Sequence, residues 1–320
     1  MNDLKDLSFL IYGLGLTGKS VVKFFNKNRF KNYKVWDDTN KSFYNKKRSL
    51  NLNKALKEAD YIILSPGVSL NQSKNKKQLI RFRNKIITDI DLFYLFYKDF
   101  KSIFVTGTNG KSTTCKIINH ILKKNKIKTL LGGNIGTPIL SLNPKKNSYL
   151  IIEVSSFQLA YSKFIKPNYA LLLNITNDHI DWHGSMKNYT SSKFKIFKNQ
   201  KQNHYSILNE DLKSQYKKRK LSGKLIIPKF YLYKKFKAKI ENKYLNLKIN
   251  DENMSFVYEL SKLFKISQKS FLACLASFRG LPHRYEIFLK KKNCIFINDS
   301  KSTTFQSTKF ALENTKNIYW

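Results

Sequence analysis

The sequence predicts an α/β protein built on parallel sheets, and three observations support this prediction. Short apolar segments alternate with helical segments along most of the chain. A glycine-rich turn directly follows the first apolar segment, and a second one opens the helix expected at Lys111. Alternating strands and helices are typical of βαβ units, and a glycine-rich turn between strand and helix is typical of a phosphate-binding site.

The composition indicates a globular protein from a reducing compartment. Hydrophobic residues make up 42 % of the 320 residues, enough for roughly two or three domains with buried cores. No apolar run approaches the ~18 residues that cross a bilayer, and no basic-then-apolar leader opens the chain. The cysteines, Cys115, Cys274 and Cys294, are too few and too scattered for a disulfide framework or a metal cluster. We therefore expect a cytoplasmic protein without a membrane partner.

Lysine supplies almost all of the net charge of +39. Arginine, on which base-reading surfaces rely, occurs only at positions 29, 48, 81, 83, 219, 279 and 284. The sequence also has no RNA- or DNA-binding motif. We therefore interpret the charge as a solvated, lysine-rich surface rather than a nucleic-acid interface, although its field attracts acidic ligands such as nucleotides.

Residues 1–98 are predicted to form a Rossmann-like domain. The expected elements are strands at residues 8–12, 33–36 and 61–64 and helices at residues 19–28 and 89–97. Residues 13–18 read G-L-G-L-T-G between the first strand and the first helix, and Asp37 ends the second strand, as in dinucleotide-binding βαβ units. Ser65, Pro66 and Gly67 follow the third strand, at the edge where parallel sheets bind ligands.

The glycine turn at residues 13–18 leaves two interpretations open. Together with Asp37, it would ordinarily indicate an NAD(P)-dependent dehydrogenase. A pyrophosphate at a helix N-terminus can also belong to a UDP-sugar. The chain leaves this short domain to enter an ATP-type loop, which counts against the dehydrogenase.

Residues 99–281 are predicted to form a P-loop ATPase-type α/β domain. Its expected elements are strands at residues 102–106, 128–131, 149–153, 170–174 and 205–209, helices at residues 111–124, 186–198, 253–264 and 267–278, and a hairpin at residues 236–249. After a Gly-Leu-Pro linker, residues 282–320 are predicted to begin a third α/β domain, with strands at residues 285–289 and 294–298, a helix at residues 305–313 and a strand from Ile318. So short a segment rarely supports its own core.

The phosphate loop is the most informative motif. Residues 106–113 read T-G-T-N-G-K-S-T, so a strand end, a glycine-rich turn and a helix N-terminus converge on one point. Lys111 would reach the outer phosphates of a nucleotide, and the Ser112 hydroxyl would hold Mg²⁺. Only Thr108 and Asn109 stand between the two glycines, whereas a standard P-loop has a longer insertion there.

Further polar side chains follow the strand ends near this loop. Glu153 is placed to coordinate Mg²⁺ between phosphates, although a carboxylate there could instead cap a helix. His179 follows a later strand, either as a second metal ligand or as an ordinary surface histidine. Lys193 lies on the next helix and carries no signal by itself in so lysine-rich a chain. Arg284 is one of few arginines, which favours a specific anion contact.

These motifs, in this order, resemble the Mur ligases, the amide ligases of peptidoglycan synthesis, and most closely the branch that adds D-glutamate. The compressed phosphate loop is similar to that of the folylpolyglutamate synthases as well. The matching residues span nearly the whole chain, at 13–18, 65–67, 106–113, 132–136, 153–158, 178–179, 280–284 and 298–303. The runs E-V-S-S-F-Q at residues 153–158 and G-L-P-H-R at residues 280–284 are the most specific to this branch.

The resemblance implies a role for each matching residue. ATP and its phosphates would contact Gly107, Thr108, Asn109, Gly110, Lys111, Ser112, Thr113, Asn134, Arg284 and Asp299. The substrate would contact Leu16, Thr17, Asp37, Ser65, Pro66, Gly67, Lys301 and Thr303. Metal ions would bind Ser112, Glu153, His179 and Lys193, the last in the carbamylated form found in the family. The catalytic residues would be Lys111, Glu153, His179 and Lys193.

The implied reaction joins D-glutamate to UDP-N-acetylmuramoyl-L-alanine with ATP and Mg²⁺ as cofactors. The alanyl carboxylate attacks the γ-phosphate and becomes an acyl phosphate, which the amine of D-glutamate then attacks. This activation is needed because a carboxylate is a very poor acceptor for an amine. We expect a monomer that has no nucleic-acid partner.

The chain also departs from the family pattern. Trp182 stands where the family has arginine, and around Asn253 the pattern His-Asn-x-x-Asn is not met, because Glu252 precedes Asn253 and Phe256 takes the second asparagine position. The resemblance implies a third domain of which residues 282–320 are only the start. Two alternatives therefore stay open: a module that binds UDP substrate and ATP without turnover, and a sister Mur ligase that adds another amino acid.

Overall fold

The computed structural model describes residues 4–39, 47–242, 244–246, 250–302, 308–309, 312–313 and 315–320. The chain forms two compact units. The first combines Met1–Lys111 with Ile127–Ile227, and the second combines Ser112–Lys126 with Pro228–Trp320. The second unit therefore consists of two separate segments, the helix after the phosphate loop and the C-terminal part of the chain.

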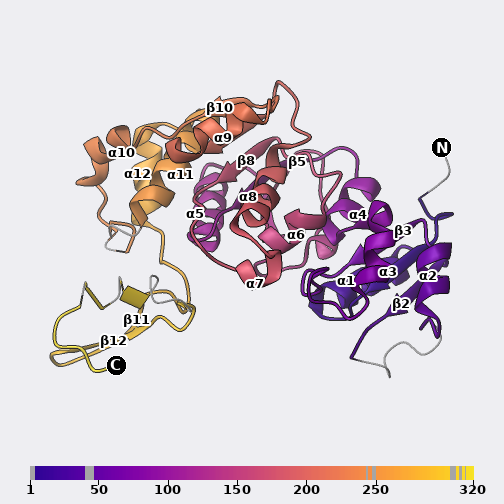
Figure 1. The fold of residues 1–320 in the computed structure, drawn as a ribbon. Helices are drawn as coiled ribbons and strands as arrows, with labels where there is room; N and C mark the ends of the chain where they lie inside the picture. Colours follow the sequence, from indigo (N-terminus) through magenta and orange to yellow (C-terminus); the bar gives the residue numbers. More distant parts are fainter. Residues whose placement is uncertain are drawn as a thin grey trace. The chain divides into compact units, whose positions relative to one another are not determined.

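The first unit contains two parallel sheets, which confirms the predicted α/β class (Figure 1). The N-terminal sheet has the strand order β2-β1-β3-β4. Its strands are β1 (Phe9–Tyr12), β2 (Tyr33–Trp36), β3 (Tyr61–Leu64) and β4 (Ile86–Ile87), and the helices of this part are α1 (Leu16–Lys27), α2 (Leu52–Glu58), α3 (Lys76–Arg81) and α4 (Asp89–Phe96). All residues of β1 are buried, as expected for a parallel strand covered on both faces.

The second sheet of this unit is six-stranded and parallel, in the order β10-β9-β8-β5-β7-β6. Its strands are β5 (Lys101–Thr106), β6 (Thr129–Gly133), β7 (Tyr149–Glu153), β8 (Tyr169–Leu172), β9 (Tyr205–Leu208) and β10 (Lys224–Ile226), and the helices of this part are α6 (Ser156–Tyr161), α7 (Ile180–His183), α8 (Met186–Phe194) and α9 (Lys213–Lys218). Because β5 lies between β8 and β7, the segments that follow these three strands share one edge of the sheet. The phosphate loop follows β5 at that edge.

The second unit is mostly helical. It contains α5 (Lys111–Lys124) beyond its first residue, α10 (Phe230–Lys237), α11 (Asp251–Leu263), α12 (Gln268–Ala276) and an antiparallel hairpin of β11 (Glu286–Lys291) and β12 (Cys294–Asn298). Helix α5 and the residue after it contact α12 through polar side chains. His120 Nε2 lies 2.9 Å from the carbonyl oxygen of Cys274, and Ser270 Oγ donates to Oδ1 of Asn125, just beyond α5, at 2.7 Å.

The structure corrects two predicted elements of this unit. The prediction of a hairpin at residues 236–249 is wrong. Phe236 lies in α10, and none of the described residues of that range is in a strand. Tyr233 and Phe236 are both buried, and the Phe236 ring lies 4.6 Å from that of Tyr258 in α11, so helical spacing prevails over the apparent alternation. The strand expected from Ile318 is also wrong, since residues 315–320 form no strand. Of the helix expected at residues 305–313, only residues 308, 309, 312 and 313 are described, and these are helical.

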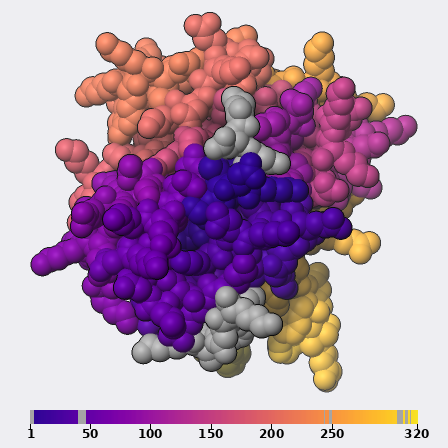
Figure 2. All heavy atoms as spheres, turned by 90° about the vertical axis from the view of Figure 1, so that its right-hand side faces the viewer, coloured from indigo at the N-terminus to yellow at the C-terminus, as the bar shows by residue number. Residues whose placement is uncertain are grey.

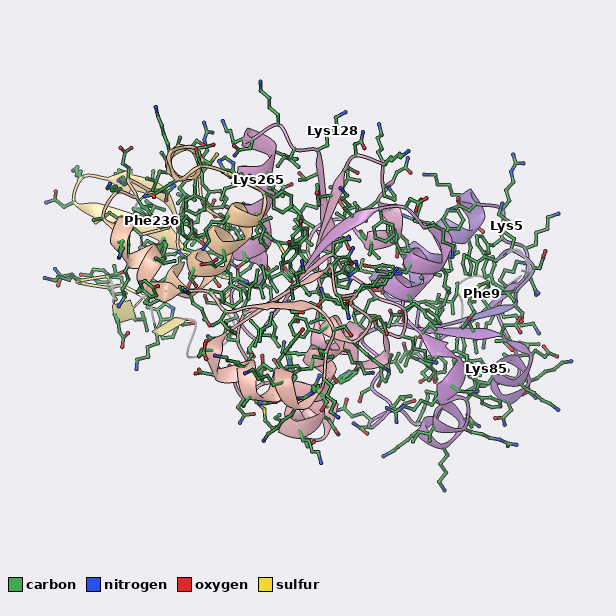
Figure 3. The ribbon with its side chains drawn as sticks, turned by 90° about the horizontal axis from the view of Figure 1, so that it is seen from above. Lys5, Phe9, Lys85, Lys128, Phe236 and Lys265 are labelled. Carbon is green, nitrogen blue, oxygen red and sulfur yellow. The ribbon has the colours of Figure 1, made fainter. Side chains whose placement is uncertain are left out.

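The lysine-rich surface is visible in the side chains. Figure 3 shows many side chains with nitrogen tips projecting outward around the ribbon, whereas Phe9 and Phe236 are buried. In Figure 2, the N-terminal residues drawn in indigo and purple also carry protruding side chains. Among the helices that the structure describes, none has the length and apolar character needed to cross a membrane.

The N-terminus of α4 connects the two sheets of the first unit. Asp91 Oδ1 accepts the backbone N–H groups of Lys163 and Phe164 at 2.9 and 2.7 Å, just after α6. The other oxygen of Asp91 closes a capping box with Thr88. Asp89 hydrogen-bonds the side chain of Gln158 in α6. Because both carboxylates are buried, these contacts hold α6 firmly against the N-terminal sheet region.

We expect Asp91→Ala to lower the free energy of unfolding by about 3 kcal/mol, because it removes one half of the capping box of α4 and leaves the N–H groups of Lys163 and Phe164 without their charged acceptor. Urea denaturation followed by circular dichroism measures this loss. Asp99→Ala, at an exposed position just after the same helix, is the matched control and should change the free energy by less than about 0.5 kcal/mol. Equal stability of the two variants would show that the Asp91 contacts do not hold the sheets together.

The pH dependence of stability tests Asp89. Burial raises the pKa of this carboxyl from 3.8 to about 6. Because the folded protein holds the proton more tightly than the unfolded chain, this group contributes its stability in full below about pH 4 and loses it as the pH rises through about 6. Relative to the native protein, Asp89→Asn should therefore gain roughly 2–3 kcal/mol between pH 4 and pH 7. Thermal and urea unfolding at both pH values measure the difference, and a constant difference would contradict the raised pKa.

Candidate active site

The phosphate loop is anchored at the end of β8. The backbone N–H of Thr108 donates to the carbonyl oxygen of Asn174 at 3.0 Å, and that of Asn109 donates to Asn174 Oδ1 at 2.9 Å. Gly110 has a φ of 82°, in the left-handed region that favours glycine. Lys111 Nζ donates to the carbonyl oxygens of Gly107 and Thr108 at 2.9 and 2.7 Å. The loop and its lysine are therefore a single ordered element.

Lys193 of α8 reaches the same loop. Its Nζ donates to the carbonyl oxygen of Gly107 at 2.7 Å and lies 4.7 Å from the centroid of the Tyr189 ring. The Tyr189 hydroxyl in turn lies 3.0 Å from Thr108 Oγ1. Burial, and to a smaller extent the charge of Lys111, lower the pKa of Lys193 well below its usual value. A buried, neutral amine is a nucleophile, which is the form that reacts with CO₂ to give a carbamate.

Glu153 is held beside Asn134. Asn134 Nδ2 donates to Glu153 Oε1 at 2.9 Å, and the Asn134 backbone N–H donates to the Glu153 carbonyl oxygen at 2.8 Å. Gly133 makes this approach possible: its φ is 100°, and a Cβ there would lie 2.3 Å from the Glu153 carbonyl oxygen. Glu153 and Asn134, which are predicted as a metal ligand and a nucleotide contact, are thus brought together at the carboxyl ends of β7 and β6.

His179 stands at the start of α7 in an unusual conformation. Its φ is 53°, and its backbone N–H donates to Asp178 Oδ1 at 2.9 Å. Its ring lies 4.8 Å from that of Phe157. His183, at the end of α7, is buried and bonds Ser156 Oγ through Nε2 at 3.0 Å. Burial lowers the pKa of His183 to about 4, so this histidine is neutral at physiological pH.

The residues present fit a Mg²⁺ ion that is shared with a nucleotide. Within the described residues, no three His, Cys, Asp or Glu side chains gather as a closed metal cage. Magnesium in nucleotide sites is usually held by one or two carboxylates, with phosphates and water completing its shell. Glu153, oriented by Asn134, supplies one such carboxylate, and a carbamate on Lys193 would supply another.

The predicted substrate residues of the first unit lie around the first glycine turn. Asp37 Oδ2 accepts the N–H of Leu14 at 2.6 Å, and Ser65 Oγ donates to the carbonyl oxygen of Gly13 at 2.7 Å. Leu16 opens α1 with 87 % of its side chain exposed, and Thr17 follows it. Pro66 and Gly67 lie in the turn after β3. The structure therefore places Asp37 and Ser65 on the same turn.

The predicted nucleotide residues of the second unit meet at Tyr244. The Tyr244 side chain hydrogen-bonds the side chain of Thr113, which follows Ser112 in the first turn of α5. Burial raises the pKa of Tyr244, and the charges of Arg284 and Asp299 have smaller effects on it. Asp299 Oδ1 accepts the N–H of Tyr285 at 2.9 Å. Of the predicted substrate residues in this unit, Lys301 donates its backbone N–H to the carbonyl oxygen of His283 at 3.1 Å. Thr303 lies outside the described residues.

Sequence reasoning missed several residues of this region. Asn174 and Tyr189 carry no pattern of their own, although an asparagine at a strand end next to a phosphate loop is a usable signal. Asn250 and Asn253 are both buried near the start of α11. They have the spacing of the two asparagines in the family pattern His-Asn-x-x-Asn. Aligning this pattern three residues earlier in the sequence would have identified them. Asn250 Nδ2 donates to the carbonyl oxygen of Tyr244 at 2.7 Å.

Comparison with known proteins gives consistent findings. The family model described as "Mur ligase middle domain" matches residues 105–273, and that described as "Mur ligase MurD-like, N-terminal domain" matches residues 8–81. The chain is 34 % identical over 389 residues to the UDP-N-acetylmuramoylalanine--D-glutamate ligase of Wolbachia sp. subsp. Brugia malayi (strain TRS), covering 100 % of this chain and 78 % of the relative. It is 35 % identical over 354 residues to the enzyme of that name from Rickettsia prowazekii (strain Madrid E), covering 100 % and 77 %.

Solved structures show the same fold. The chain superposes on the MurF ligase of Thermotoga maritima in complex with ADP with a TM-score of 0.56 and 15 % identity, covering 98 % of this chain and 75 % of that one. It superposes on the UDP-N-acetylmuramate:L-alanyl-gamma-D-glutamyl-meso-diaminopimelate ligase of Neisseria with a TM-score of 0.55 and 13 % identity, covering 86 % and 99 %.

Proposed function

The chain belongs to the Mur ligase family, and on this premise we propose that it joins D-glutamate to UDP-N-acetylmuramoyl-L-alanine in an ATP-dependent reaction. The observation that carries the proposal is the position of Lys193. Its side chain is buried, and its amine donates to the carbonyl oxygen of Gly107 in the phosphate loop at 2.7 Å. The names of the relatives support D-glutamate as the added amino acid. A sister ligase that adds another amino acid is the alternative.

In this proposal the phosphate loop binds ATP. Gly107, Thr108, Asn109 and Gly110 contact the phosphates, while the N–H groups of Thr108 and Asn109 stay bonded to Asn174 and hold the loop in place. Lys111 neutralises the charge that develops on the transferred phosphoryl group. Ser112, Thr113, Asn134, Arg284 and Asp299 complete the nucleotide contacts. The substrate contacts Leu16, Thr17, Asp37, Ser65, Pro66, Gly67, Lys301 and Thr303.

Glu153, His179, Ser112 and a carbamate on Lys193 would hold Mg²⁺, which supplies positive charge between the phosphates when bound. The carbamate forms when the neutral amine of Lys193 attacks the carbon of CO₂ and loses a proton. The carbamate places a negative charge beside Lys111, and the positive charge of Lys111 favours that negative charge. Lys111, Glu153, His179 and Lys193 are therefore the proposed catalytic residues.

The chemistry proceeds in two displacements. An oxygen of the alanyl carboxylate attacks the γ-phosphorus, the bond to the β-phosphate oxygen breaks, and ADP leaves. The amine of D-glutamate then attacks the acyl carbon, and the tetrahedral intermediate collapses with loss of a proton and of inorganic phosphate. The chain contributes positioning at the glycine turns and positive charge at Lys111.

The organisation of the chain is part of the proposal. We place the substrate domain at residues 1–98, the ATP domain at residues 99–281 and the start of the third domain at residues 282–320. We also propose that the protein acts in the cytoplasm as a monomer, and that its lysine-rich surface serves no nucleic acid.

Phosphate release by the purified chain tests the function. With ATP, Mg²⁺ and UDP-N-acetylmuramoyl-L-alanine present, we expect release that depends on D-glutamate and is not supported by L-lysine or meso-diaminopimelate. Preference for another amino acid would replace the proposal by a sister ligase. Calorimetric titration with UDP-N-acetylmuramoyl-L-alanine is run in parallel, and absence of binding would overturn the proposal altogether.

A further inference from the structure

A short loop of the N-terminal sheet region holds α7 by its carbonyl groups. Ser69 Oγ donates to the carbonyl oxygen of Trp182 at 2.9 Å, and Asn71 Nδ2 donates to the same oxygen at 3.2 Å. Gln72 Nε2 donates to the carbonyl oxygen of Asp181 at 3.1 Å. We call residues 69–72 the latch. Its central bond, from Ser69 to Trp182, is buried.

Helix α7 depends on the latch because it is too short to satisfy its own carbonyl groups. It has only four residues, and the last carbonyls of a helix lack partners within it. The carbonyl oxygens of His179 and Ile180 accept the N–H groups of His183 and Gly184, and that of His183 accepts Asn188 Nδ2. Only the carbonyls of the two central residues remain, and the latch supplies donors to both.

The backbone of Leu70 and the ring of Trp182 extend this contact to α6. The Leu70 N–H donates to the Tyr161 hydroxyl at 2.9 Å. The Trp182 ring lies 4.7 Å from that of Phe157 and 5.5 Å from that of Tyr161. Trp182, where the family pattern has arginine, is thus part of an aromatic cluster next to the latch.

The conformation of His179 depends on the element that follows it. A non-glycine residue with a φ of 53° lies in the sparsely populated left-handed region and keeps this conformation only when its surroundings fix it. Asp178 fixes the N–H of His179 on one side, and α7, gripped by the latch, fixes its carbonyl on the other. Loosening the latch therefore releases His179.

The latch is continuous with the two turns to which ligands are proposed to bind. On one side it follows residues 65–67, where the Val68 N–H donates to the carbonyl oxygen of Ser65 at 3.0 Å. On the other side, the segment before His179 is bonded to the phosphate loop, because the Thr176 N–H donates to Thr108 Oγ1 at 3.0 Å. A chain of covalent and hydrogen bonds thus joins the two turns.

We propose that Ser69, Asn71 and Gln72 are positioning residues that couple binding of the UDP substrate at residues 65–67 to binding of the nucleotide at the phosphate loop. The inference rests on the proposed function, which assigns the two ligands to these two turns. A ligand bound at residues 65–67 orders the latch, and the latch orders α7 and His179. Binding of the nucleotide then costs less conformational entropy, because this part of the site is already ordered. By linkage the effect is reciprocal.

Calorimetric titrations test the coupling without relying on turnover. UDP-N-acetylmuramoyl-L-alanine is titrated into the full chain alone, and into the chain saturated with Mg²⁺ and a non-hydrolysable ATP analogue. We expect about tenfold tighter binding in the presence of the analogue. In Ser69→Ala/Asn71→Ala, the ratio of the two dissociation constants should fall to within about twofold of one, while Ser69→Thr, which keeps a hydroxyl donor, retains it. Asn53→Ala, exposed on α2, is the matched control and also retains it.

The outcomes separate the inference from the function on which it rests. A double variant that folds, binds both ligands and keeps the native ratio overturns the role of the latch. A native protein that binds both ligands independently also overturns it, but leaves the proposed ligase standing. A native protein that does not bind the UDP substrate at all removes both. If the double variant unfolds, Gln72→Ala, which removes only the exposed bond to Asp181, replaces it and should lower the ratio by about half.

Discussion

Replacing Lys193 by arginine is expected to lower kcat for D-glutamate-dependent phosphate release by about 10²- to 10³-fold. The Lys193 side chain is buried against the Gly107 carbonyl, and its lowered pKa favours the neutral amine from which the proposed carbamate would form. Arginine cannot lose its proton in a protein and so cannot form this group. The variant also brings a permanent positive charge next to Lys111 in place of a negative one, which reverses the local electrostatics.

Carbon-13 spectroscopy measures the chemical basis of this effect. In ¹³CO₂-enriched buffer, the native protein should show a carbamate carbonyl signal that Lys193→Arg lacks. Lys198→Arg, an exposed lysine on the segment that follows α8, is the matched control and should keep both the signal and the rate. Native turnover in Lys193→Arg would remove this lysine from the catalytic residues.

Glu153→Gln is expected to lower kcat by about 10²-fold, with little change in the affinity for the UDP substrate. The replacement keeps an oxygen that can accept from Asn134 Nδ2, so the local fold is retained. It removes the one full negative charge that this position offers to Mg²⁺, and the concentration of Mg²⁺ needed for half-maximal rate should therefore rise.

Steady-state rates over a Mg²⁺ series measure both effects of Glu153→Gln. Glu210→Gln, on the exposed surface where the glutamate pairs with Lys213, is the matched control and should leave both quantities unchanged. A full loss of UDP-substrate binding in Glu153→Gln would instead indicate that the glutamate supports the fold rather than the metal.

The parts of the fold that local sequence determines were predicted well. The helix at residues 111–124 was placed correctly because a glycine turn opens it and apolar residues recur along one face. Strands at residues 33–36, 61–64 and 149–153 were also placed correctly, as short β-branched or aromatic runs between turns. In each case the information lies within a few neighbouring residues.

What the sequence did not reveal depends on contacts between distant segments. Phe236 alternates with polar neighbours as a strand residue would, and only its packing against α11 and α12 makes it helical. The contact of Asp91 with Lys163 and that of Ser69 with Trp182 have no local signature, because the partners lie 72 and 113 positions apart. The residues of the candidate site were identified by family resemblance, and their roles remain predictions, whereas the geometry around Lys193 and Glu153 required the structure.

The interleaving of the two units has a consequence for the order of folding during translation. Helix α5 is synthesised long before its partner α12, since His120 and Cys274 are 154 positions apart. At about 5–20 residues per second, a ribosome needs roughly 8–30 s to cover that interval. Throughout it, the surface of α5 that later packs on α12 has no partner within the emerging chain. We therefore expect the nascent protein to be most sensitive to aggregation, and most dependent on chaperones, between the synthesis of these two helices.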